Sequence, residues 1–220
     1  MVRWNAALAL LLSVTVSGNA RADEPLALRR SWAGNLDFFS TGAPLATDSD
    51  NDGKVDSLAQ PGKVTVGALE VPAGAELDAA YLYWGATQVA SGCDPAKLDA
   101  EVSFTPPGGA ATAVKAEVCH CSASPGYDMQ LCRAEVTAEL DALTGEYAVE
   151  GLTALIKNGD TNNASFAIVL VYQKDTLPQR RIDLYDGLFG LVSSGTPTTT
   201  IALGGVKITD PPQGDLTWYA

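Results

Sequence analysis

The 220-residue sequence predicts an all-β fold of the sandwich or barrel kind. Short runs of apolar or alternating residues recur along the chain, and Gly, Pro, Asn and Asp separate them at short intervals. Two of these runs are apolar at both parities, so both faces of the corresponding strands must be covered. No internal repeat or long low-complexity linker divides the chain, and a single domain over residues 23–220 is the simplest interpretation.

Residues 1–22 have the three parts of a cleavable secretory signal: a positive start, a short apolar run and small residues at the cleavage point. These parts are Arg3, the run from Ala6 to Val16, and Ala20-Arg21-Ala22. The apolar run is about a dozen residues long, whereas a helix that spans a bilayer needs roughly 20. No later stretch is apolar for long enough either. We therefore predict a mature chain that begins at Asp23, has no transmembrane span, and is secreted or displayed at the cell surface.

The charge of the chain limits its partners. The formal net charge is −12, and loss of the signal removes Arg3 and Arg21 but no acid, which gives −14. A surface this acidic repels phosphate backbones and anionic lipids, so nucleic acid is a poor partner. The same surface attracts divalent cations. We expect the partner to be a protein or a glycan at the cell surface, and the sequence leaves the oligomeric state open.

Eight runs are expected to form the strands, and two of them are expected at the centre of a sheet. Ala79–Trp84 and Phe166–Tyr172 are apolar or aromatic at every position, as strands covered on both faces require. Arg181–Tyr185 alternates instead, which is typical of a strand with one face in water. In chain order, the eight runs are Lys63–Val71, Leu77–Ala86, Glu101–Thr105, Ala113–Val118, Tyr147–Leu152, Ser165–Gln173, Arg181–Leu191 and Thr198–Ile208.

One segment, Ala134–Leu143, departs from the strand pattern. Val136, Leu140 and Leu143 lie at i, i+4 and i+7 within it, and a glycine follows two residues later as a stop signal. This spacing predicts one short helix that packs on the sheets.

The strongest local motif is the acidic stretch Asp48–Asp56. Acids at its first, third and fifth positions, followed by Gly53 at the sixth, let a tight loop bring carboxylates to one point, as a hard cation requires. The loop resembles calcium loops of the thrombospondin type 3 and dockerin kinds. The expected calcium ligands are the side chains of Asp48, Asp50 and Asp52, the backbone carbonyl of Lys54, and Asp56 directly or through water.

The motif is not a complete EF-hand. Ala59 stands at the twelfth position, where a bidentate glutamate is needed, and Pro44 and Pro61 oppose two flanking helices. A site without that ligand would bind calcium weakly, at roughly 10⁻⁴–10⁻³ M. The alternative is a solvated acidic turn without an ordered ion.

The four cysteines are Cys93, Cys119, Cys121 and Cys132, and an even number in an exported protein indicates disulfides first. A bond between Cys119 and Cys121 would close a ring too small for relaxed geometry. Cys93 is therefore expected to pair with one of these two and Cys132 with the other, and both arrangements stay open. The alternative is a zinc site that uses His120 and the thiols. Neighbouring residues on a strand point to opposite faces, so we expect His120 to face away from the flanking thiols and to be exposed.

The reactive side chains form no recognisable catalytic frame. The chain has a single histidine, and no serine lies in a G-x-S-x-G motif. We expect no enzymatic activity, with a carbohydrate-active hydrolase that uses paired carboxylates as one alternative. A carbohydrate-binding module is another, in which Tyr81, Tyr83 and Trp84 would stack on a sugar. Their place on a central strand favours core residues instead.

Several phrases of the sequence, taken together, resemble a family of bacterial secreted and surface-exposed β proteins. They are Ser31–Gly42, Val71–Ala75, Ala79–Gly85, Phe166–Tyr172, Leu177–Ile182 and Leu184–Gly187. Myxobacterial adventurous-gliding-motility proteins and related surface proteins have similar openings. The resemblance implies a jelly-roll-like or immunoglobulin-like sandwich at the N-terminus of larger exported proteins, usually without catalysis. Family members continue past the strand that begins here near Leu216–Tyr219, which indicates a C-terminally incomplete domain or a short form.

The sequence thus favours a non-catalytic, secreted or surface-displayed module with a structural, adhesive or interaction role. Two disulfides and one calcium loop are its expected special features.

Overall fold

The computed structural model describes most of the chain between the signal segment and the C-terminal residues. The described residues are 24–89, 93–124, 127–156 and 163–188. The signal segment 1–22, the strand expected over Thr198–Ile208 and the chain end at Leu216–Tyr219 lie outside them. The elements are β1 Glu24–Pro44, β2 Ala46–Thr47, β3 Ser57–Leu58, β4 Gly62–Val66, β5 Glu76–Val89, η1 Pro95–Lys97, β6 Glu101–Thr105, β7 Thr112–Lys115, β8 Val118–Ser124, β9 Tyr127–Glu135, η2 Thr137–Glu139, β10 Gly145–Glu150, β11 Ala164–Gln173 and β12 Gln179–Leu188.

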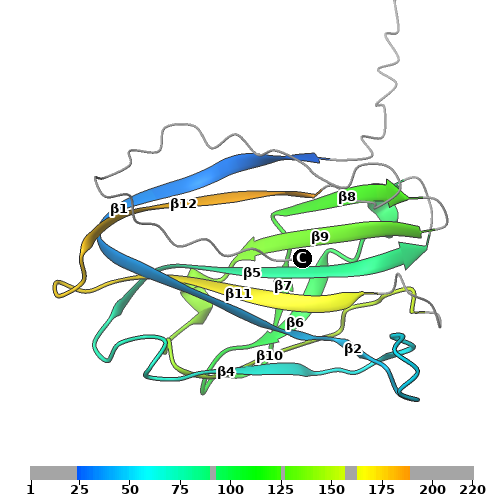
Figure 1. Cartoon of the computed structure of the whole chain (residues 1–220), viewed down its shortest axis with the longest axis horizontal. Helices are drawn as coiled ribbons and strands as arrows, with labels where there is room; N and C mark the ends of the chain where they lie inside the picture. The colour runs from blue at the N-terminus through cyan, green and yellow to red at the C-terminus, as the bar shows by residue number, and fades with distance from the viewer. Residues whose placement is uncertain (1–23, 90–92, 125–126, 157–162, 189–220) are drawn as a thin grey trace, which may run out of the picture.

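The strands form two packed sheets (Figure 1). The larger sheet has the order β12-β1-β11-β5-β9-β8, and the smaller sheet has the order β4-β10-β6-β7. Strands β2 and β3 form a separate short pair. All the strand pairs in the described residues are antiparallel. The expected antiparallel all-β sandwich is therefore confirmed.

An inner core fills the space between the two sheets. Alternate residues of β5, among them Leu82 and Trp84, point into it from the larger sheet, and Phe104 and Tyr147 meet them from the smaller one. All four side chains are fully buried. Full burial of a side chain of this size stabilises a fold by about 1.5–3 kcal/mol. The inner core therefore supplies much of the hydrophobic stability.

The two halves of strand β1 pair with different strands. Its second half, residues 36–44, pairs with β11, whereas its first half pairs with β12 as far as Asn35. We call residues 24–35 of β1 together with β12 the ribbon. In Figure 1 strand β1 bends back on itself, and β12 with the adjoining part of β1 lies above β11, β5 and β9. Side chains of β12 reach β8 and β9, so the two ends of the sheet come back into contact.

The ribbon covers a second apolar cluster on the outer face of the larger sheet. We call it the outer cluster, and its buried members are Trp32, Leu36, Ala79, Tyr81, Tyr83, Ala167 and Val171. The Trp32 ring packs edge-on against Tyr81, with 6.2 Å between ring centroids. Strands β5 and β11 are thus covered on both faces, as their unbroken apolar runs predict.

The prediction of a helix over Ala134–Leu143 is wrong. Ala134 belongs to β9, and only Thr137–Glu139 turns, as the 3-10 element η2. Val136 N donates to Ala80 O at 2.8 Å and Ala80 N donates to Thr137 Oγ1 at 2.9 Å, so this segment stays bound alongside β5 as it leaves β9. The apolar spacing arises from a strand end followed by a turn.

The expected strands match the structure best where the residues are apolar. Strand β6 has the expected bounds, and β11 begins one residue earlier than expected. The run Lys63–Val71 ends early, at Val66, because Gly67 O accepts a hydrogen bond from Val71 N at 3.2 Å and closes a turn. The run Ala113–Val118 is divided between β7 and β8. Most of β1, β8 and β9 was not expected.

Candidate functional site

The acidic loop connects β2 to β3 and is closed by its own carboxylates. Asp56 N donates to Thr47 O at 3.0 Å, and Ser49 donates to Asp56 through its N–H at 3.0 Å and its hydroxyl at 2.8 Å. Gly53 N donates to Asp48 Oδ2 at 2.7 Å. Gly53 has a φ of 87°, a left-handed conformation that glycine adopts without cost. The loop therefore curls around its acidic side chains.

Three of the expected ligands meet inside this loop. One carboxylate oxygen each from Asp48, Asp50 and Asp56 lies within 4.8 Å of the other two, close enough for one cation to contact all three. Asp52 does not belong to that group; its Oδ1 accepts a hydrogen bond from Lys54 N at 2.9 Å. The roles expected for Asp52 and the Lys54 carbonyl as ligands stay predictions.

Hydrogen bonds hold the Asp56 carboxylate in its charged form. The backbone N–H and the hydroxyl of Ser49 lower the pKa of Asp56 below its ordinary value, and the hydroxyl of Ser57 adds to this effect. Carboxylate oxygens are the donor set that hard cations such as calcium and magnesium prefer. The chemistry open to this loop is therefore cation binding.

Two disulfides lie at the edge of the larger sheet that β8 and β9 form. Cys93 is bonded to Cys121, and Cys119 is bonded to Cys132, which lies directly across from it on β9. The crossed pairing is confirmed. No free thiol is left among the four cysteines, so the alternative zinc site is wrong.

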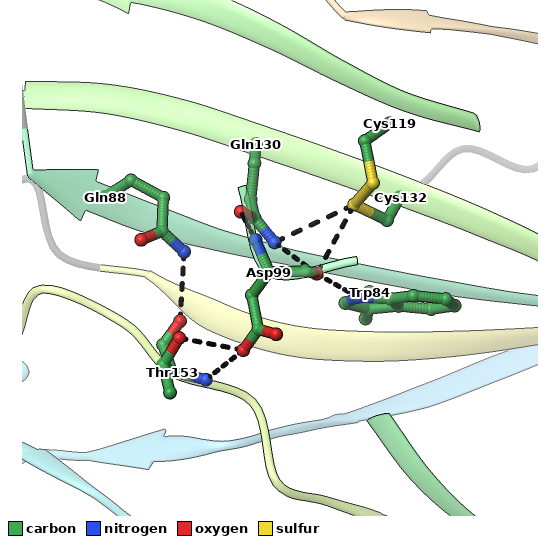
Figure 2. Close-up of a disulfide and its surroundings, with 7 residues drawn as sticks. All are labelled: Trp84, Gln88, Asp99, Cys119, Gln130, Cys132 and Thr153. Atoms are coloured by element: carbon green, nitrogen blue, oxygen red, sulfur yellow. Dashed lines mark hydrogen bonds between the residues drawn. A yellow bond between two sulfur atoms is a disulfide. The ribbon is translucent and has the colours of Figure 1, made fainter. Parts of the chain in front are cut away.

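A polar network that runs from the core to the surface surrounds the second disulfide (Figure 2). Asp99 N donates to Gln130 Oε1 at 2.8 Å, while Gln130 Nε2 and Trp84 Nε1 donate to Asp99 O at 3.1 and 2.9 Å. The Asp99 carboxylate accepts hydrogen bonds from the N–H and the hydroxyl of Thr153. The β5–β6 connection is thereby fixed to the core and to the chain after β10. No sequence pattern marks Asp99 for this role, because its partners are distant in sequence.

His120 is buried, and the expectation that it is exposed was wrong. It has 2% of its surface exposed, because the outer face of β8 is covered by β12. Its Nε2 lies 3.6 Å from Asp186 Oδ1. His120 does face away from the flanking thiols, as expected, since Cys119 packs against the inner core and His120 reaches the ribbon.

Asp186 is the centre of a charged cluster beneath the ribbon. Arg29 Nε pairs with Asp186 Oδ1, and Arg133 Nε lies 2.9 Å from Asp186 Oδ2. Burial raises the pKa of Asp186, but the nearby His120, the hydrogen bond from Arg29 and the charge of Arg133 together outweigh burial and hold it below its ordinary value. Asp186 is therefore a carboxylate at neutral pH. Burial also raises the pKa of the nearby Tyr83, which stays a neutral phenol.

The aromatic residues of β5 are core residues. Tyr81, Tyr83 and Trp84 expose between 0% and 6% of their surface, too little to stack on a sugar. A hollow on the surface instead lies beside the β4–β5 connection and is lined by residues 71–77 and 140–144, including Glu76 and Asp141.

Fold and covalent structure define a disulfide-bonded antiparallel β-sandwich, and its disulfides indicate an oxidising environment. Comparisons with protein-family models, curated proteins and solved structures give no match. The resemblance to bacterial surface proteins therefore stays a prediction. In the described part of the chain, no helix has the length and apolar character needed to cross a membrane.

Proposed function

We propose that this protein is a non-catalytic module, secreted or held at a cell surface, that acts in structure, adhesion or interaction and binds calcium in its acidic loop. The observation that carries the proposal is the convergence of the Asp48, Asp50 and Asp56 carboxylates within 4.8 Å. All three offer oxygen, the ligand atom that calcium prefers. The signal segment and the two disulfides support an extracytoplasmic location.

Calcium has a structural role in this proposal. The cation neutralises three carboxylates that otherwise repel one another, and it stiffens the loop between β2 and β3. Without a bidentate glutamate at Ala59 the affinity is low, roughly 10⁻⁴–10⁻³ M, which suits an extracellular module. The loop is thus occupied at steady extracellular calcium and does not act as a signalling switch.

The burial of the reactive groups supports a non-catalytic role. The single histidine lies beneath the ribbon, where no substrate can reach it, and all four cysteines are in disulfides. Apolar strand residues, glycines and aromatic residues make up the phrases that resemble bacterial surface proteins, and such residues determine a fold rather than a reaction.

Calcium binding is tested by thermal unfolding of the mature protein. With a dissociation constant in this range, 10 mM calcium should stabilise the fold by about 1.4–2.7 kcal/mol and raise the melting temperature. Asp50→Asn should abolish the rise. Asp141→Asn is the matched control, because it removes the same charge from an exposed site away from the loop. An equal response in all three proteins would reduce the loop to an acidic turn.

The non-catalytic role is tested separately. The purified mature protein should hydrolyse none of a broad panel of glycans, esters and peptides, and deletion of its gene should alter surface attachment, cohesion or envelope integrity. Reproducible turnover that is lost in Glu76→Gln or Asp141→Asn, the acids that line the hollow, would establish the hydrolase alternative.

A further inference from the structure

Four strands contribute ionisable side chains to one cluster beneath the ribbon, which we call the latch. The ribbon provides Arg29 from β1 and Asp186 from β12, and the underlying sheet provides His120 from β8 and Arg133 from β9. Asp186 is 3% exposed and His120 is 2% exposed. These ionisable groups join the ribbon to β8 and β9. The strength of that contact therefore depends on their charges.

Hydrogen bonding in the rest of the interface beneath the ribbon is also less complete than in the inner core. Trp32 Nε1 and the Tyr83 hydroxyl are buried without a hydrogen-bond partner. A buried polar group in this state loses its bonds to water and destabilises the closed form. Arg30 adds a cation–π contact, at 5.0 Å from the Trp32 ring centroid, and an ion pair of 3.4 Å with the half-exposed Glu135. Water that enters beneath the ribbon would satisfy the orphan groups.

The fold also provides a point about which the ribbon can move. Strand β1 changes partner between Asn35 and Leu36. Hydrogen bonds hold the chain in place at this corner, where β1 changes partner. Asn35 Nδ2 donates to Leu177 O at 2.5 Å, and Lys174 N donates to Asn35 O at 3.0 Å. The ribbon strands stay paired with each other, and residues 36–44 stay paired with β11. Opening at this corner therefore breaks the latch without breaking the larger sheet.

Protonation of His120 opposes the closed form. Arg29 contacts Oδ1 of Asp186, the oxygen nearest His120, and Arg133 contacts Oδ2, so a charged imidazole would be a third cation around one carboxylate while both His120 and Asp186 are buried. Tyr83 on β5 is neutral, and Glu117 pairs with Arg133 at 3.2 Å from a half-exposed position, where solvent weakens its effect. Within the described part of the chain, the charges around His120 therefore favour its neutral form beneath the closed ribbon.

We propose that the ribbon is an acid-released flap: below about pH 6.5, protonation of His120 detaches residues 24–35 and β12 from β8 and β9 and exposes the outer cluster. In the open form His120 is in water and takes up a proton near the ordinary histidine pKa of about 6.5. The open form then binds one proton more than the closed form. Its population relative to the closed form rises by up to tenfold for each pH unit below that value.

The exposed surface would be aromatic and apolar. Tyr81 and Tyr83 lie on it, next to Ala79 and Val171, and the released ribbon would present Trp32. The flap itself does not depend on the calcium loop, because none of the loop carboxylates takes part in the latch.

Hydrogen exchange of the mature wild-type protein tests the flap. After correction for the intrinsic effect of pH on exchange, protection of the ribbon amides should fall about eightfold between pH 7 and pH 5.5, while that of β6 and β10 stays constant. His120→Gln removes the titrating group and should make ribbon protection independent of pH over this range. Ribbon protection that stays constant in the wild type, or that falls equally in His120→Gln, overturns the proposal.

A second measurement needs no variant. The chain contains one histidine, so its imidazole proton signals can be assigned in an NMR titration without ambiguity. The signals should move to the protonated position over the same pH range in which the ribbon amides lose protection. A histidine that becomes protonated while the ribbon stays protected would show that the latch tolerates the charge, and would overturn the proposal.

Discussion

The inner core and the outer cluster lie on opposite faces of the same strands, yet they are stabilised in different ways. In the inner core, polar atoms of the large side chains are bonded: Trp84 Nε1 donates to Asp99 O at 2.9 Å, and the Tyr147 hydroxyl donates to Leu143 O at 2.8 Å. In the outer cluster, Trp32 Nε1 and the Tyr83 hydroxyl are buried without such bonds. Next to the outer cluster, a buried carboxylate carries three cationic or ionisable partners.

The difference separates two kinds of stability within one sandwich. Apolar burial with satisfied hydrogen bonds depends little on pH, because none of its groups titrates near neutrality. A contact that depends on a carboxylate and a histidine changes with the charge of each. The inner core should therefore determine whether the chain folds, and the latch should determine how firmly the ribbon is held.

The largest effect should come from truncating a tryptophan of the inner core. Trp84→Ala should lower the free energy of unfolding by about 3–5 kcal/mol, because the residue is fully buried and its loss leaves a cavity. Trp32→Ala is the matched variant in the outer cluster and should cost less, about 1.5–3 kcal/mol. Urea denaturation at pH 7 measures both. Equal losses would mean that the two clusters contribute alike.

The next effect concerns the disulfide whose sulfurs adjoin the inner core. Replacing Cys119 and Cys132 by alanine should destabilise the fold by about 3 kcal/mol, because an open chain loses more entropy on folding. The loss should be the same at pH 5.5 and pH 7, since no group of the latch is changed. Denaturation midpoints at the two pH values provide the check, and a pH-dependent loss would connect the disulfide to the latch.

The smallest of these effects should come from Asp186→Asn, and it should depend on pH. Loss of charged hydrogen bonds should cost about 1.5–3 kcal/mol at pH 7. Because the folded-state pKa of Asp186 is lowered, its contribution is complete above the unfolded pKa of about 3.9 and is lost as pH falls through the folded value. In a His120→Gln background, where the ribbon is not released by acid, stability measured from pH 7 to pH 3 should show the proteins with and without Asp186→Asn converging only below pH 4. A constant difference would mean that the carboxylate charge is not what stabilises the ribbon.

Much of the sandwich could be predicted because apolar strands carry their own signal. The runs that became β5, β6, β10 and β11 are rich in β-branched and aromatic residues, and turn residues bound them. Strands β1, β8 and β9 include arginines, serines, cysteines and a histidine, so their pattern did not distinguish them from loops. The false helix at Ala134–Leu143 has a related cause, because a strand end and a turn together reproduced the helical spacing.

The sequence by itself determined the all-β class, the exclusion of a bond between Cys119 and Cys121, and the acids that the β2–β3 loop gathers. Each of these follows from residues close together in the chain, where backbone geometry limits the outcome. Only the tertiary structure decided that His120 is buried against Asp186, 66 positions away in sequence. The period of a strand assigns each side chain to a face, but what covers that face depends on where a distant segment such as the ribbon folds.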